Sequence, residues 1–179
     1  MAVAPAVVFT GISSAEYLAL AQRGVLDEAR VELIDGRIVS VTPQSDEHAY
    51  VLVHLTELLA LAGGLHVQAP LVAGPTSVPE PDLALAQRRG IKHPVTARLV
   101  IEVVWSQWHE AMRKLPLYAA ADVGECWIVD IPKRVVHVHD RPSGREYGRT
   151  RKFTGSDVLK PPCTTIRFTA ADVFARLDE

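Results

Sequence analysis

Three side chains have the types and spacing to support metal-dependent chemistry: Asp82, Glu102 and Lys114. Asp82 follows Pro81 at the start of a short apolar run, Glu102 interrupts a longer apolar run, and Lys114 lies in the next segment. Two carboxylates on adjacent strands can bind a divalent cation, and Mg²⁺ completes its shell with water and a phosphate oxygen. A nearby lysine can orient water or stabilise developing charge. The set predicts phosphodiester hydrolysis with Mg²⁺, which Mn²⁺ can replace.

Two of these residues have simpler explanations that the sequence leaves open. Glu102 lies within 97–105, a run rich in Val, Ile and Leu that predicts a strand buried on both faces. A buried carboxylate needs a cation, but an arginine serves as well as a metal, and a strand end would leave it half solvated. Lys114 lies four residues after Glu110 on a predicted helix, where an exposed pair contributes only about 0.3 kcal/mol.

The elements that would position these residues follow from caps, turns and periodicity. Ser13 and Glu16 form a capping box, and Asp35–Gly36 has the signature of a type I′ hairpin turn with Glu32 on the preceding strand. Pro116 predicts a kink or a restart in the helix that carries Lys114. The predicted elements are helices at 13–22, 45–63 and 107–121, a short helix after Thr169, a hairpin at 30–41, strands at 65–72, 81–86, 97–105, 125–131 and 134–140, and an outer strand or loop at 144–153.

Three histidines could also act as ligands. His48 shares a helix face with Leu52, Leu55 and Leu59, so its position alone favours a core residue over a functional one. His137 and His139 share one face of a predicted strand, where they alternate with valines. That pattern favours the wetter face of an outer strand over a metal pair, because no third ligand lies nearby in the sequence.

The composition indicates one soluble globular domain covering 1–179. Of the 179 residues, 48% are hydrophobic and 22% charged, and the net charge of −2 gives no global attraction for nucleic acid. Cys126 and Cys163 lack metal-ligand spacing, which fits reduced thiols in the cytoplasm. No apolar run reaches about 18 residues and the start lacks a basic signal-peptide region, so we expect a cytoplasmic protein without membrane contact.

Six motifs in order resemble one known family. The chain is similar to the bacterial restriction-endonuclease-like proteins of the PD-(D/E)XK nuclease superfamily, in the group long described as a domain of unknown function. The resemblance covers most of the chain. The motifs are Val31-Glu-Leu-Ile-Asp-Gly36, the helix opening with His48, Val78-Pro-Glu-Pro-Asp-Leu83, Val100-Ile-Glu-Val-Val104, Lys114-Leu-Pro-Leu-Tyr118 and Cys126-Trp-Ile-Val-Asp130.

The resemblance implies a mixed α/β (α+β) domain, with an αβββαβ core that an N-terminal helix and β-hairpin precede. It further implies Mg²⁺-dependent cleavage of nucleic acid, with DNA expected, and a homodimer. Asp82 and Glu102 match the metal-binding acids, Lys114 the catalytic lysine, and Glu32 and His48 supporting polar positions. The superfamily's usual lysine position holds Val104 here, but this family carries that lysine on the next helix.

The segment after Glu102 departs from the family pattern. Trp105 and Trp108 replace small polar residues, and Glu110 stands where Asp is usual. The tryptophans could narrow the site or stack on bases, although core or dimer contacts are the favoured interpretation. Phosphate contacts are expected at basic surface positions. These are Arg88, Arg89, Lys92, Arg149, Arg151 and Lys152.

Two other classes of function remain open at this stage. The first is a catalytically weak or inactive nuclease fold that binds nucleic acid or protein, because a fold does not fix a function. The second is a small-molecule metallohydrolase, which requires a pocket too closed for a duplex. Convergence of Asp82, Glu102 and Lys114 on an open cleft favours the nuclease, whereas a tryptophan plugging that cleft favours the binding module.

Overall fold

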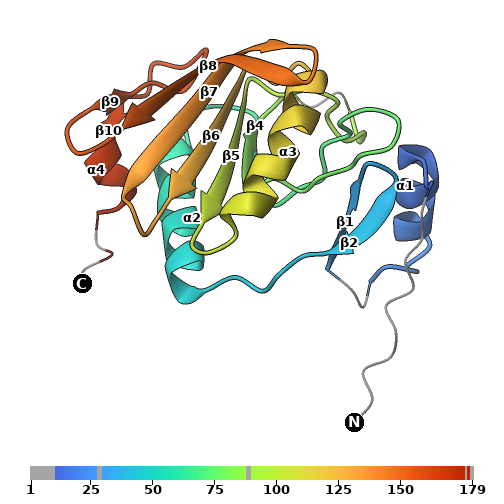
Figure 1. The fold of residues 1–179 in the computed structure, drawn as a ribbon. Helices are drawn as coiled ribbons and strands as arrows, with labels where there is room; N and C mark the ends of the chain where they lie inside the picture. Colours follow the sequence, from blue (N-terminus) through green and yellow to red (C-terminus); the bar gives the residue numbers. More distant parts are fainter. Residues whose placement is uncertain (1–10, 28–29, 88–89, 176, 178–179) are drawn as a thin grey trace.

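A six-stranded mixed sheet forms the centre of the molecule in the computed structural model, which describes residues 11–27, 30–87, 90–175 and 177 (Figure 1). Its strand order is β3-β4-β5-β6-β7-β8. The strands are β3 Leu65–Val67, β4 Leu83–Leu85, β5 Leu99–Val104, β6 Glu125–Asp130, β7 Val135–Ser143 and β8 Glu146–Phe153. Strands β5 and β6 are parallel and the other neighbours are antiparallel. The parallel pair needs a crossover, which the helix between them supplies.

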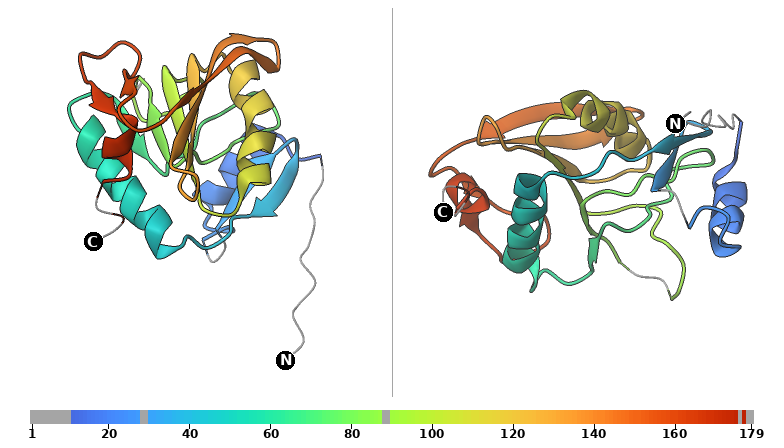
Figure 2. Two further views of the ribbon diagram at one scale, coloured as in Figure 1. Left: turned by 60° about the vertical axis from the view of Figure 1, so that its left-hand side comes forward. Right: turned by 90° about the horizontal axis from the view of Figure 1, so that it is seen from below.

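Two helices cover opposite faces of this sheet (Figure 2). Helix α2, Asp46–Leu59, packs on the face that carries Leu99, Ile101 and Val103, and α3, Trp108–Ala120, packs on the face that carries Val100 and Val104. Successive strand residues point to opposite faces, which explains why both sets are apolar and buried. Because side chains alternate along β5, Glu102 lies on the face that α3 covers.

The helix that crosses from β5 to β6 continues through its proline. Helix α3 contains Pro116 and runs to Ala120 without a restart. Leu115, Leu117 and Tyr118 around the proline are buried, so packing keeps this turn helical although Pro116 has no amide hydrogen to donate.

The N-terminal helix and hairpin lie at one end of the sheet (Figure 1). Ser13 caps α1, Ser14–Gln22, in the predicted capping box, and the hairpin pairs β1, Val31–Ile34, with β2, Arg37–Ser40. Asp35 and Gly36 both have positive φ, 45° and 74°, as a type I′ turn requires. Leu33 also pairs with Val78, so the hairpin is attached to the segment that leads to Asp82.

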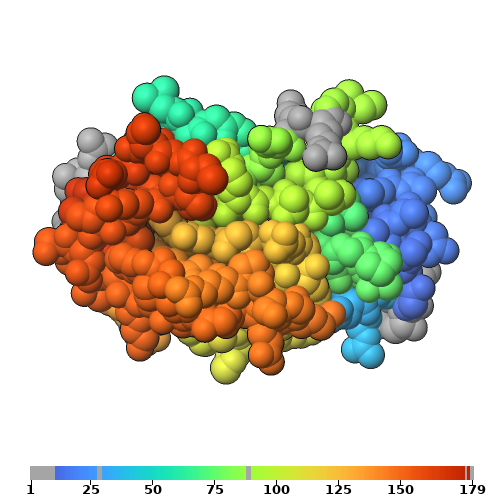
Figure 3. Space-filling model, turned by 90° about the horizontal axis from the view of Figure 1, so that it is seen from above, coloured from blue at the N-terminus to red at the C-terminus, as the bar shows by residue number. Residues whose placement is uncertain are grey.

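The C-terminal segment packs beside the β7–β8 end of the sheet. It contains β9 Val158–Leu159, β10 Phe168–Thr169 and α4 Ala170–Val173. In the view from above, this segment covers the end opposite the N-terminal unit (Figure 3). No helix in the described ranges is both long enough and apolar enough to cross a bilayer.

Two predicted strands are shorter than the sequence pattern indicated. The strand predicted at 65–72 comprises only β3, and the strand predicted at 81–86 comprises only β4. Prolines at 70, 75, 79 and 81 lie between the two strands, and proline cannot donate to a ladder. Asp82 therefore precedes β4 rather than lying inside it.

Two adjacent glycines after α2 provide a stability test of the fold. A Cβ at Gly64 would lie 2.3 Å from the carbonyl oxygen of Ala86, whereas a Cβ at Gly63 would meet no described atom within 4 Å. Both have positive φ, 71° and 68°, so either alanine carries a strain of about 1 kcal/mol. We expect Gly64→Ala to lower the unfolding free energy by about 2–4 kcal/mol and Gly63→Ala by only about 1 kcal/mol in urea titrations. Equal losses would contradict this close contact between the turn and β4.

Candidate active site

Asp82 and Glu102 lie side by side where β4 and β5 meet. Leu83 pairs with Ile101, and continuing this antiparallel register by one residue places Asp82 opposite Glu102. The Val103 amide donates to Asp82 Oδ2 at 2.8 Å, which fixes the carboxylate against the strand that carries Glu102. Both acids are buried, with exposures of 7% and 6%.

Glu102 receives two partners from α3. The Tyr118 hydroxyl donates a hydrogen bond to Glu102 Oε1, and Lys114 Nζ lies 3.4 Å from the same oxygen. Burial raises the pKa of Glu102 to about 7, an effect that Lys114 reduces and that Asp82 and Glu32 reinforce. Because α3 approaches Glu102 through Oε1, the described residues leave Oε2 without a hydrogen bond. That oxygen is the one available to a ligand.

Lys114 connects the sheet to the hairpin. Its ammonium donates to Glu32 Oε1 at 2.8 Å, and the Glu80 amide donates to the same oxygen at 3.0 Å. Burial alone would lower the pKa of Lys114, but Glu102 and Glu32 outweigh burial and raise it. The alternative of an exposed Glu110–Lys114 pair is wrong, because the ammonium turns inward to these two buried acids.

His48 supports Asp82 from the first turn of α2. Ser45 caps this helix by accepting from the His48 amide, and His48 Nε2 lies 3.0 Å from Asp82 Oδ1. Gln68 reaches the same oxygen at 3.5 Å. The helix face that carries the packing leucines thus also carries His48 to the carboxylate. The helical spacing correctly predicted that His48 is buried, but it did not predict the contact between His48 and Asp82.

These side chains line one open cavity of about 80 Å³. Its lining includes the three residues Asp82, Glu102 and Lys114, together with Glu32 and His48. Trp105, 42% exposed, and Trp108 are not among the lining residues. Trp108 instead packs edge-on against His137, at 4.8 Å between ring centroids, and lies under Lys133. The cavity is therefore not plugged by either tryptophan.

The donor set of this cavity suits Mg²⁺ better than a softer metal. The available oxygens belong to carboxylates, which hard cations prefer. Within the described ranges, no group of three or more His, Cys, Asp or Glu side chains is placed to hold a metal by itself. Mg²⁺ is commonly bound by one or two carboxylates plus waters and substrate phosphate, so Asp82 and Glu102 fit that ion.

Four of the six residues expected to contact phosphate are described by the structure, and none of the four lines this cavity. Arg149 and Arg151 bind Asp140, at 2.8 Å each, and the exposed Lys92 and Lys152 do not line the site. Arg88 and Arg89 fall outside the described residues. A role for any of the six in binding nucleic acid stays a prediction.

The paired histidines of β7 pack beneath α3. His139 Nδ1 lies 3.0 Å from the Thr150 hydroxyl, and His137 contacts the Trp108 ring. Burial lowers the pKa of both histidines, which favours their neutral forms. The face that the sequence assigned to solvent is thus mostly covered.

Sequence reasoning missed three residues of the site: Tyr118, Gln68 and Glu80. Tyr118 had a readable signal, since it lies four residues after Lys114 and therefore on the same helix face. Gln68 and Glu80 lie in the proline-rich connection, and their contacts depend on the path of that loop. No local pattern could indicate them.

Comparisons with known proteins agree with this fold. A family model named Uma2 and described as "Putative restriction endonuclease" matches residues 14–171. No curated protein matches the chain. A solved structure, described as a putative nuclease belonging to DUF820 from Anabaena variabilis ATCC 29413, is similar with a TM-score of 0.70 and 16% identity, over 92% of this chain and 98% of that one. The predicted mixed α/β fold is confirmed. Because the family model matches most of this chain, the chain belongs to the Uma2 family of restriction-endonuclease-like proteins.

Proposed function

We propose that this protein is a Mg²⁺-dependent endonuclease that hydrolyses phosphodiester bonds of DNA. The observation that carries the proposal is the convergence of Asp82, Glu102 and Lys114, from three separate elements, on one open cavity. Membership of a family described as "Putative restriction endonuclease" supports the same chemistry. The family resemblance also leads us to propose a homodimer. From the composition of the chain we further propose a single domain, 1–179, and a cytoplasmic location.

Each side chain has a defined task in this proposal. Asp82 and Glu102 hold the cation, and His48 and Tyr118 fix the orientation of these two carboxylates. Glu32 fixes the Lys114 ammonium, whose raised pKa keeps it charged at neutral pH. A fixed positive charge beside the reacting phosphate stabilises the negative charge that develops on its oxygens.

The reaction is the addition of water to phosphorus with loss of an ester oxygen. When bound, Mg²⁺ supplies Lewis acidity that lowers the pKa of the attacking water and offsets charge on the phosphate. The water oxygen forms a bond to phosphorus while the bond to the leaving sugar oxygen breaks, giving a phosphate monoester and a hydroxyl. Lys114 is the residue of this chain placed to stabilise the phosphoryl oxygens during that exchange.

The geometry favours catalysis over a purely binding role. A plugged cleft would favour the binding module, yet neither Trp105 nor Trp108 lines the cavity. The three central side chains form direct contacts with supporting partners, which is the pre-organisation that catalysis requires.

Cleavage of plasmid DNA tests the proposal. We expect the wild-type protein to nick or cut the plasmid with Mg²⁺ or Mn²⁺ and to stop when EDTA is added. Asp82→Asn should reduce cleavage by on the order of a thousandfold while leaving the circular dichroism spectrum unchanged. Asp130→Asn is the matched control, because Asp130 is also buried but lies outside the cavity. Equal cleavage by the wild type and Asp82→Asn would refute the assignment.

A further inference from the structure

The candidate active site is the middle of a longer surface depression. Glu32, Val41, Glu110 and Lys114 line both the central cavity and an adjoining hollow of about 140 Å³ between α3 and the hairpin. The central cavity also shares Arg30, Val41, Pro43 and Gln44 with a third hollow, which reaches the start of α2. The three hollows meet at Val41 and form one continuous track, and Lys114 lines two of them.

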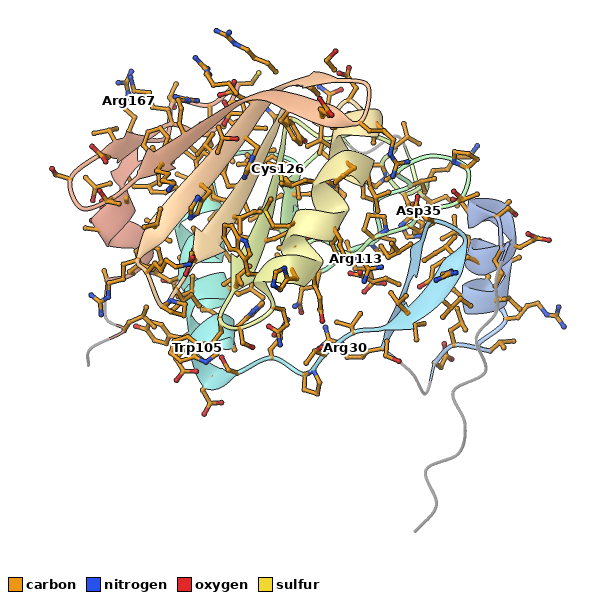
Figure 4. All side chains as sticks on the ribbon, viewed as in Figure 1. Arg30, Asp35, Trp105, Arg113, Cys126 and Arg167 are labelled. Atoms are coloured by element: carbon orange, nitrogen blue, oxygen red, sulfur yellow. The ribbon has the colours of Figure 1, made fainter. Side chains whose placement is uncertain are left out.

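Two arginines line this track, and one of them, Arg30, also lines the central cavity. Arg113, on α3, lines the hairpin-side hollow, and Arg30, just before β1, lines the hollow toward α2. Figure 4 shows both between the lower part of α3 and the hairpin, and shows Arg167 at the far end of the sheet. Within the described ranges, neither Arg30 nor Arg113 forms an ion pair or a side-chain hydrogen bond, and both are exposed. Their guanidinium groups are free to bind a ligand.

The charge along the track has a pattern that suits a phosphodiester strand. Five carboxylates line the central cavity, at Glu32, Glu80, Asp82, Glu102 and Glu110. Arg30 lines this central cavity together with Glu80. In the proposed reaction the cation and the reacting phosphate meet at this acidic centre, and the two arginines place positive charge beside it. Arg149 and Arg151, by contrast, already form ion pairs with Asp140.

We propose that Arg30 and Arg113 bind the phosphates that flank the scissile phosphate on the same strand. Guanidinium groups bind phosphate through paired N–H donors, and two such contacts set the register of the strand over Lys114. In the hairpin-side hollow, Ile34 and Val39 provide an apolar wall for a sugar or a base. The inference rests on the proposed endonuclease function and adds two specific contacts to it.

Binding without metal tests these contacts separately from cleavage. The probe is a fluorescein-labelled 20-nucleotide DNA, single-stranded or annealed to its complement, titrated in EDTA at several salt concentrations and followed by anisotropy. We expect Arg30→Gln and Arg113→Gln each to weaken binding about 3- to 10-fold, and to reduce the slope of log K against log salt by about 0.7 to 0.9. Arg167→Gln is the matched control and should change neither quantity, because Arg167 is also exposed but is remote from the track.

The outcomes separate this inference from the proposed function. The contacts are supported if Arg30→Gln and Arg113→Gln both lower the affinity and the slope of log K against log salt while Arg167→Gln changes neither. This holds even if the wild type cleaves no DNA in Mg²⁺. Affinity and slope equal to wild type in Arg30→Gln and Arg113→Gln would overturn the contacts even if cleavage is vigorous. Equal losses in all three variants would also overturn them, because a diffuse charge effect would then account for binding.

Discussion

Glu102→Gln is expected to abolish metal-dependent cleavage and at the same time to stabilise the folded protein at neutral and higher pH. Loss of the carboxylate removes one of two proposed metal ligands, for which we expect a rate decrease on the order of a thousandfold or more. The variant gains stability because an ionised, buried Glu102 imposes a desolvation penalty on the folded state, and glutamine carries no charge. Glutamine fills the same volume and can still accept the Tyr118 hydrogen bond.

The sign of the stability effect follows from the raised pKa. Burial raises the pKa of Glu102 from 4.5 to about 7, so between these two pH values the folded state binds more protons than the unfolded state. The unfolding free energy contributed by this group therefore falls as pH rises from about 4.5 to about 7. Glutamine does not titrate, so the variant should exceed the wild type in urea midpoint at pH 8 and match it closely at pH 4.5.

Asp140→Asn is the matched control for Glu102→Gln. Burial alone would raise the pKa of Asp140, but hydrogen bonds from Arg149 and Arg151 outweigh it and lower the pKa. This acid contributes stability above the pKa that it has in the unfolded chain, so its replacement should lower the urea midpoint at pH 8 and leave cleavage unchanged. A lower midpoint for Glu102→Gln at pH 8 would show that Glu102 is primarily a structural ion-pair partner.

Lys114→Met is expected to produce the largest loss of stability among single changes in the site. The ammonium lies 2.8 Å from Glu32 Oε1 and 3.4 Å from Glu102 Oε1, and both acids are buried. Removing the cation leaves two buried carboxylates unpaired, and breaking a buried pair in this way costs about 3–5 kcal/mol. Cleavage should also fall by about a hundredfold or more, since the charge beside the reacting phosphate is lost.

Two further variants separate charge from packing at Lys114. Lys133→Met is the matched control, because the Lys133 side chain is 69% exposed, so solvent screens its pair with the buried Asp130 and we expect a loss of only about 1 kcal/mol. In the triple variant Glu32→Gln, Glu102→Gln, Lys114→Met, all three charges are replaced by neutral side chains of similar size. Its urea midpoint should recover most of the loss. A triple variant as unstable as Lys114→Met would assign the loss to packing instead.

Local sequence patterns determined the elements that carry the site. The capping box at Ser13, the Asp35–Gly36 turn and the Ser45 cap each involve residues within about four positions of one another, so their geometry follows from the local chain. The apolar run around Glu102 is a fully buried strand, as its composition predicted. Asp82, Glu102 and Lys114 were chosen in the same way, from residue type and the order of elements.

Only the tertiary structure decided which residues meet. Glu32 and Lys114 are 82 positions apart, and His48 and Asp82 are 34 apart, so sheet register and the path of the proline-rich loop set these contacts. Local spacing instead suggested Glu110 as the partner of Lys114, because a helix makes that pair available at little cost. Burial reversed this preference, because the ammonium stabilises two buried carboxylates far more than it stabilises one exposed carboxylate. The Lys114 side chain therefore lies in the site.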